Sequence, residues 1–70
     1  MMKFFKYEFE TLEDREMAFN NIVKWYGNTI VEKIEKFGLN IRATKDVICE
    51  TGKIAEKHFG RRTTDVLSHH

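Results

Sequence analysis

The longest regular pattern of apolar and polar positions in the chain runs over residues 12–26. On a helical wheel, its apolar side chains fall in one arc of roughly 160°, and charged and amide side chains lie opposite. A two-residue period would scatter the same side chains over both faces of a strand. The pattern therefore predicts an amphipathic helix. Its apolar arc consists of Ala18, Phe19, Ile22, Val23, Trp25 and Tyr26, and continues into Thr29 and Ile30.

Both ends of this helix carry recognisable signals. Thr11 and Asp14 have the spacing of a capping box, in which the threonine hydroxyl accepts a hydrogen bond from a backbone N–H of the first turn. Glu13, Asp14 and Glu16 place negative charge at the positive end of the helix dipole. Gly27 interrupts the pattern, so we expect the helix to end at residue 26.

A second, shorter helix is predicted over residues 29–37. Thr29 and Glu32 repeat the capping-box spacing directly after Gly27, and Gly38 provides a stop signal. The apolar phase of the first helix carries across Gly27. A single helix with a glycine inside, at a cost of roughly 1 kcal/mol relative to alanine, is therefore the alternative.

An aromatic-rich strand is predicted over residues 3–9. Phe5, Tyr7 and Phe9 alternate with charged residues and so share one face. Aromatic side chains and strict alternation are typical of a half-buried strand. Because the N–H and C=O groups of a strand need partners, a second strand must come from this chain or from another molecule.

The segment 39–43 is the best internal candidate for that second strand, because Leu39, Ile41 and Ala43 alternate with polar residues. If strand 3–9 does not pair with it, pairing between two chains is expected. A chain of 70 residues has a small core. Since it also has one strong strand, we expect a homodimer.

Helical spacing returns over residues 45–59, with Thr44 or Asp46 as the N-cap and Gly60 as the stop. Gly52 lies inside this helix. The alternative is a strand over residues 46–50 followed by a turn. Residues 61–70 are polar and are expected to form a flexible tail.

These elements predict a small single α+β domain. Its compact part is residues 1–60, with an N-terminal strand, two or three helices and a possible short second strand at 39–43. The apolar content of 41% is enough for a packed core. The absence of proline and the many lysine, isoleucine and phenylalanine residues indicate an AT-rich coding sequence, which is consistent with a phage, mobile-element or Firmicute-like source.

Composition favours a binding protein over an enzyme. Cys49 and His58 are the best nucleophile and base, but a spacing of nine residues puts them on opposite sides of a helix. No spacing typical of a metal site or a phosphate-binding loop is present, so we expect no metal and no cofactor. A single cysteine and no secretory signal indicate a cytoplasmic protein.

The outer face of the first helix is the predicted contact surface for a protein partner. Met17 lies there among uncharged amides, and protein interfaces are enriched in methionine and depleted in charge. Trp25 lies at the edge of the apolar arc, where it is either a core residue or a partly exposed anchor. We therefore expect an inhibitor or adaptor, of the kind that phages and mobile elements carry. The predicted partner-binding residues are Met17, Asn20, Asn21, Lys24 and Trp25.

DNA binding is the alternative function. The net charge of +1 gives no global attraction to nucleic acid, but basic residues gather in two places. The candidate nucleic-acid-binding residues are Lys3, Lys6, Lys53, Lys57, Arg61 and Arg62.

The order of strand 3–9, helix, Gly27-Asn28-Thr29 turn and second helix resembles that of a ribbon–helix–helix repressor. This resemblance covers about half of the chain. It implies that two chains pair their strands and insert the resulting ribbon into the DNA major groove. Phe4, Lys6 and Glu8 would then face the DNA, and both Phe4 and Glu8 depart from the polar and basic residues usual in that row.

Overall fold

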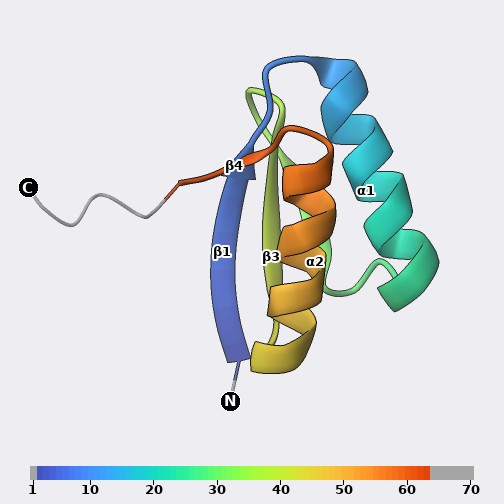
Figure 1. Cartoon of the computed structure of the whole chain (residues 1–70), viewed down its shortest axis with the longest axis vertical. Helices are drawn as coiled ribbons and strands as arrows, with labels where there is room; N and C mark the ends of the chain where they lie inside the picture. The colour runs from blue at the N-terminus through green and yellow to red at the C-terminus, as the bar shows by residue number, and fades with distance from the viewer. Residues whose placement is uncertain (1, 64–70) are drawn as a thin grey trace, which may run out of the picture.

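The structure is a computed structural model that describes residues 2–63, with four strands and two helices (Figure 1). Residue 1 and residues 64–70 lie outside this description. In chain order the elements are β1 (Met2–Glu8), α1 (Leu12–Tyr26), β2 (Val31–Ile34), β3 (Gly38–Thr44), α2 (Lys45–Lys57) and β4 (Arg61–Thr63).

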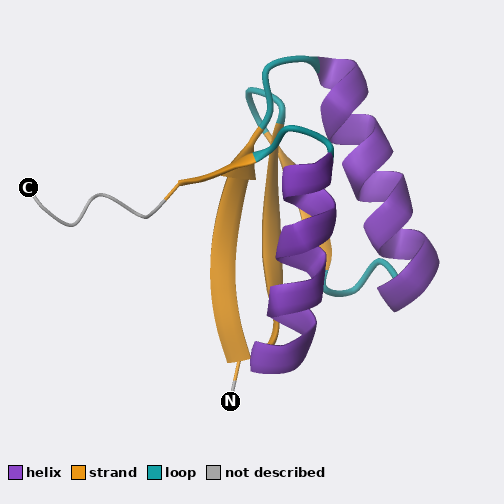
Figure 2. Ribbon diagram, viewed as in Figure 1, coloured by secondary structure: helices purple, strands orange, loops and turns teal. Residues whose placement is uncertain are grey.

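The four strands form one antiparallel sheet in the order β2-β3-β1-β4. This βαββαβ order is the split βαβ, or ferredoxin-like, arrangement. The two helices lie side by side against one face of the sheet and run in opposite directions (Figures 1 and 2). No element of the described chain covers the opposite face, which we call the open face.

The core lies between the sheet and the helices. Ile22 of α1 and Leu39 and Ile41 of β3 are completely buried. Smaller residues, Ala18 of α1 and Ala55 of α2, let the helices approach the sheet closely. The predicted class, a small single α+β domain, is confirmed, although the sheet has more strands than expected.

Four predicted elements are present. Helix α1 has the predicted bounds, and the Thr11 hydroxyl accepts a hydrogen bond of 3.1 Å from the Asp14 N–H. Gly27 ends α1 with φ 86° and donates its N–H to the Val23 carbonyl, which excludes one helix continuing through this glycine. Residues 46–50 lie within helix α2, so the predicted helix is present and the alternative strand over these residues is wrong.

The predicted strand 3–9 pairs within the chain. Every residue of β1 faces one of β3, from Met2 opposite Thr44 to Glu8 opposite Gly38. The segment 39–43 is therefore the partner strand, as the internal alternative predicted. Phe9 follows β1 directly and remains in the core, where it is 5% exposed.

The predicted helix over residues 29–37 is wrong, because this segment forms β2 and the turn into β3. Val31 pairs with Ile41 and is buried. Lys36 and Phe37, with φ of 61° and 58°, then reverse the chain. The spacing of apolar residues fits a helix locally, but the free edge of β3 offers hydrogen-bonding partners that a short isolated helix lacks.

The predicted flexible tail is wrong for residues 61–63, which form β4 and pair with residues 6–8 of β1. The rest of that tail, residues 64–70, lies outside the described residues. The ribbon–helix–helix order is not present, because its second helix is replaced by β2 and its strand pairs within the chain. Phe4, Lys6 and Glu8 share the open face of the sheet, on the side away from buried Tyr7.

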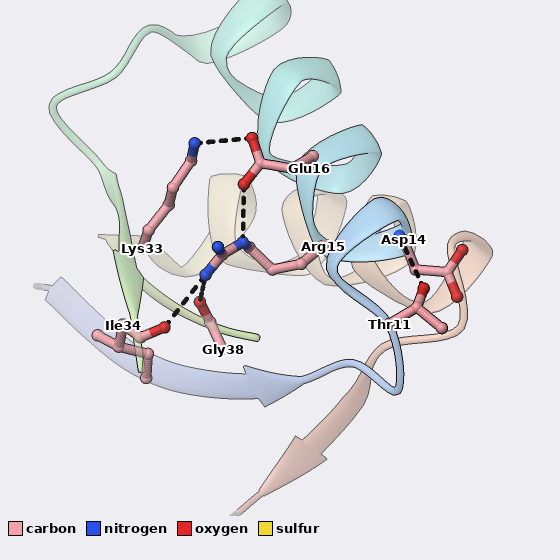
Figure 3. A network of polar contacts seen from close by, with 7 residues as sticks. All are labelled: Thr11, Asp14, Arg15, Glu16, Lys33, Ile34 and Gly38. Atoms are coloured by element: carbon pink, nitrogen blue, oxygen red, sulfur yellow. Dashed lines mark hydrogen bonds and ion pairs between the residues drawn. The ribbon is translucent and has the colours of Figure 1, made fainter. Parts of the chain in front are cut away.

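A polar network fastens α1 to the β2–β3 hairpin (Figure 3). Arg15 donates to the backbone carbonyls of Ile34 at 3.1 Å and Gly38 at 3.2 Å. Glu16 accepts from Arg15 at 3.0 Å and from the Lys33 amino group at 2.7 Å. The Lys33 hydrogen bond, followed by weaker contributions from Arg15, lowers the pKa of Glu16 below its ordinary value.

Candidate functional site

The most exposed large apolar side chain of α1, Trp25, lines a shallow groove between the two helices. Trp25, the single tryptophan of the chain, is 68% exposed although it is a large aromatic residue. It lines the groove, of about 260 Å³, together with Tyr26, and α2 contributes Ile54 and the flanking Glu50, Lys53 and Lys57. We call this surface the α1–α2 groove.

Met17, Asn21 and Trp25 follow one another at intervals of four residues along α1 and form a stripe beside this groove. Met17 is 47% exposed. Asn21 is half-buried, with its side-chain amide 3.4 Å from the His58 ring at the end of α2. The stripe therefore has an exposed apolar side chain at each end, Met17 and Trp25, and a polar contact between the helices at Asn21 in the middle.

Asn20 and Lys24 lie next to the stripe on α1 and are exposed. All five predicted partner-binding residues thus belong to one continuous helical surface, although the Asn21 amide already contacts the His58 ring. The helical wheel alone left the position of Trp25 open. The structure places it outside the core, because Ala18 and Ile22 already fill the contact between α1 and the sheet.

The predicted nucleic-acid-binding residues do not form one cluster. Lys3, Lys53 and Arg62 line a groove of about 480 Å³ between β1 and α2. Lys6 and Arg61 lie on the open face. In the strand register, Lys6 of β1 is opposite Asn40 of β3, and Arg61 of β4 is opposite Glu8 of β1. The sixth residue, Lys57, lines the α1–α2 groove.

The second groove, between β1 and α2, contains residues that the sequence did not assign to any binding site. Phe5, Tyr7 and Ile48 form its apolar part, and Lys45 adds a further cation. Burial raises the pKa of the Tyr7 hydroxyl above its ordinary value; the Glu56 carboxylate adds to this shift and Arg62 opposes it. No local pattern predicts this convergence, because it depends on β1 lying beside α2.

Cys49 and His58 lie in different places: Cys49 lines the β1–α2 groove, whereas the His58 ring contacts Asn21 of α1. Within residues 2–63, no three histidine, cysteine, aspartate or glutamate side chains gather in a way that could hold a metal ion. Neither helix of this part of the chain is long and apolar enough to cross a membrane.

Comparisons with known proteins found no matching family model, curated protein or solved structure.

Proposed function

We propose that this protein is a non-enzymatic binding protein, an inhibitor or adaptor, that docks its α1–α2 groove onto another protein. The observation that carries the proposal is Trp25, which is 68% exposed at the edge of an apolar groove. Tryptophan is the residue type most enriched among interface residues whose truncation costs 2 kcal/mol or more. A tryptophan exposed without a partner leaves a large apolar surface in water.

The surroundings of Trp25 suit a protein interface. Met17 and Ile54 add apolar surface at the stripe and in the groove. Asn20 and Asn21 supply uncharged hydrogen-bonding groups, and Lys57 lies at the rim. An apolar centre with a polar rim is the usual organisation of protein–protein contacts.

The test compares capture of a partner by the wild-type chain with capture by Trp25→Ala. We expect Trp25→Ala to lower the affinity for the captured partner by at least about tenfold, the effect of losing an interface anchor. Leu12→Ala is the matched control: it shortens another exposed apolar side chain, 50% exposed, on the same helix. Because the wheel puts Leu12 roughly 140° from Trp25, the control should bind normally.

The fluorescence of Trp25 gives a second readout. In the free protein its emission should be red-shifted and readily quenched by acrylamide, and partner binding should shift the emission to the blue. Equal affinity of wild type and Trp25→Ala for the same partner would contradict the proposal.

A second candidate function is the binding of single-stranded nucleic acid on the open face of the sheet. Phe4 is 58% exposed there and lies opposite Arg42. Exposed aromatic side chains stack on bases, and cations contact phosphates.

Fluorescence anisotropy with labelled oligonucleotides of about ten nucleotides tests this candidate. We expect single strands to bind more tightly than duplex DNA, with affinity that falls as salt rises. Phe4→Ala should weaken binding, whereas Phe59→Ala, which changes a still more exposed phenylalanine far along the chain, should not. Equal binding by both variants would exclude the open face.

A further inference from the structure

The groove between β1 and α2 lies beside an incomplete edge of the sheet. Strand β4 pairs only with residues 6–8, whereas β1 continues to Met2. Within the described chain, no strand pairs with the outer side of residues 2–5. The groove opens along this unpaired segment, since Lys3 and Phe5 are among its lining residues.

The backbone of this segment has hydrogen-bonding groups that point outward. The Phe9 N–H donates to the Phe37 carbonyl on the β3 side, at 3.0 Å. Residues of an antiparallel strand alternate between the two sides, so the odd-numbered residues of β1 bond to β3. Phe4 therefore directs both its N–H and its C=O toward the outer edge, and Met2 directs its C=O there.

The groove has an apolar floor that is fixed in position. The Arg62 guanidinium lies over the Phe5 ring, 4.5 Å from its centre. Tyr7 is 3% exposed, and its hydroxyl fits against α2 because Gly52 has no side chain. A side chain that enters the groove would thus meet a packed aromatic surface and would not have to displace it.

Positive charge surrounds this floor. Lys3, Lys45, Lys53 and Arg62 line the groove, against one carboxylate, Glu56. Within residues 2–63, only Lys53 of these cations has an ion-pair partner, Glu50 at 4.0 Å. A ligand whose charge complements this groove would therefore be acidic.

We propose that this site binds an extended acidic segment of a partner protein, which adds to the sheet as a further strand beside β1. Its backbone would hydrogen-bond with Phe4 and Met2. Alternate side chains would point into the groove, where an apolar side chain contacts Phe5 and acidic ones contact Lys3 and Lys45. Main-chain bonds give affinity in this mode of recognition, and the pocket gives specificity. The inference does not rest on the α1–α2 groove.

The test uses the full chain and a fluorescein-labelled peptide of about eight residues. Its groove-facing positions, every second residue, carry two glutamates with a valine between them, and its other positions are threonine. We expect saturable binding, and slower hydrogen exchange of the Phe4 amide in the complex. N-methylation of the peptide amides that face β1 should weaken binding by about tenfold or more, because it removes ladder hydrogen bonds. A peptide with lysine in place of glutamate should not bind.

Protein variants test the charge complementarity. Lys3→Glu and Lys45→Glu should each weaken peptide binding by about tenfold, since both are rim charges. Lys36→Glu makes the same charge change in the β2–β3 turn and should leave binding unchanged. Trp25→Ala should also bind the peptide normally, which separates this site from the α1–α2 groove.

Three results would overturn the proposal. Equal binding of the N-methylated peptide would show attraction by charge alone. Binding seen only after removal of residues 64–70 would make that segment of the chain the occupant. A dimer that Lys3→Glu dissociates would make a second copy the occupant.

Discussion

A single glycine sets the distance between α2 and β1. Gly52 lies inside α2, where glycine is roughly 1 kcal/mol less favourable than alanine. A Cβ on this residue would lie 2.6 Å from the Tyr7 hydroxyl oxygen and 3.7 Å from the ring carbon that bears it. The close approach of the helix to the sheet therefore depends on the absence of a side chain at position 52.

We predict that Gly52→Ala destabilises the protein by about 1–3 kcal/mol despite its better helix propensity, because the buried tyrosine cannot move aside. In a Tyr7→Phe background the clashing oxygen is absent, and the same substitution should be neutral or stabilising by up to about 1 kcal/mol. Urea unfolding of the four proteins measures both effects. An identical change in the two backgrounds would contradict this explanation.

Glu16 gives a prediction about pH. Its pKa is lowered in the folded protein, first by the hydrogen bond from Lys33 and then by Arg15. The folded state thus favours the carboxylate, so the stabilisation is complete above the unfolded pKa of about 4.3 and is lost as pH falls through the lower folded value. NMR titration should show this low pKa, and Lys33→Gln should raise it. An unchanged pKa in Lys33→Gln would contradict the assignment.

Among the secondary-structure elements, the β2–β3 hairpin depends most on a distant side chain. Arg15 is 11% exposed and bonds to two hairpin carbonyls. Arg15→Met should therefore cost about 1.5–3 kcal/mol, the usual loss for hydrogen bonds to a charged group. Hydrogen exchange of the hairpin amides should accelerate as well. Arg42→Met, at an exposed position on β3, should change stability by less than about 0.5 kcal/mol.

The elements that the sequence predicts correctly are those with strong periodicity. Helix α1 has a wide apolar arc and a capping residue, β3 alternates apolar and polar residues from Leu39, and β1 alternates from Phe5 onward. Strands β2 and β4 lie at the two edges of the sheet, and they are short. An edge strand of three or four residues buries too few side chains to show a period of two, so only its neighbours reveal it.

The same reasoning applies to the candidate sites. The α1 surface around Met17 and Trp25 could be predicted, because positions on one helix follow from the wheel alone. The groove formed by Lys3, Lys53 and Arg62 could not be predicted, since it requires the sheet order that puts β1 between β3 and β4. Charges far apart in the sequence come together only through that order.

For the whole molecule, the homodimer stays a prediction. One reason for it no longer holds, because strand β1 finds its partner within the chain. Light scattering at high protein concentration should still show association if exposed apolar residues such as Phe4 and Trp25 pair between copies. A mass that remains at 8.4 kDa would contradict the homodimer.

The central place of β1 in the sheet also affects how the protein is made. This strand is synthesised before the other described elements, and both of its neighbours, β3 and β4, come later in the chain. Because synthesis adds about 5–20 residues per second, the aromatic side chains of β1 stay exposed for seconds before the later strands can cover them. During translation, β1 therefore exposes an aggregation-prone segment that a chaperone could bind, and native pairing with β3 becomes possible only after residue 44 leaves the ribosome.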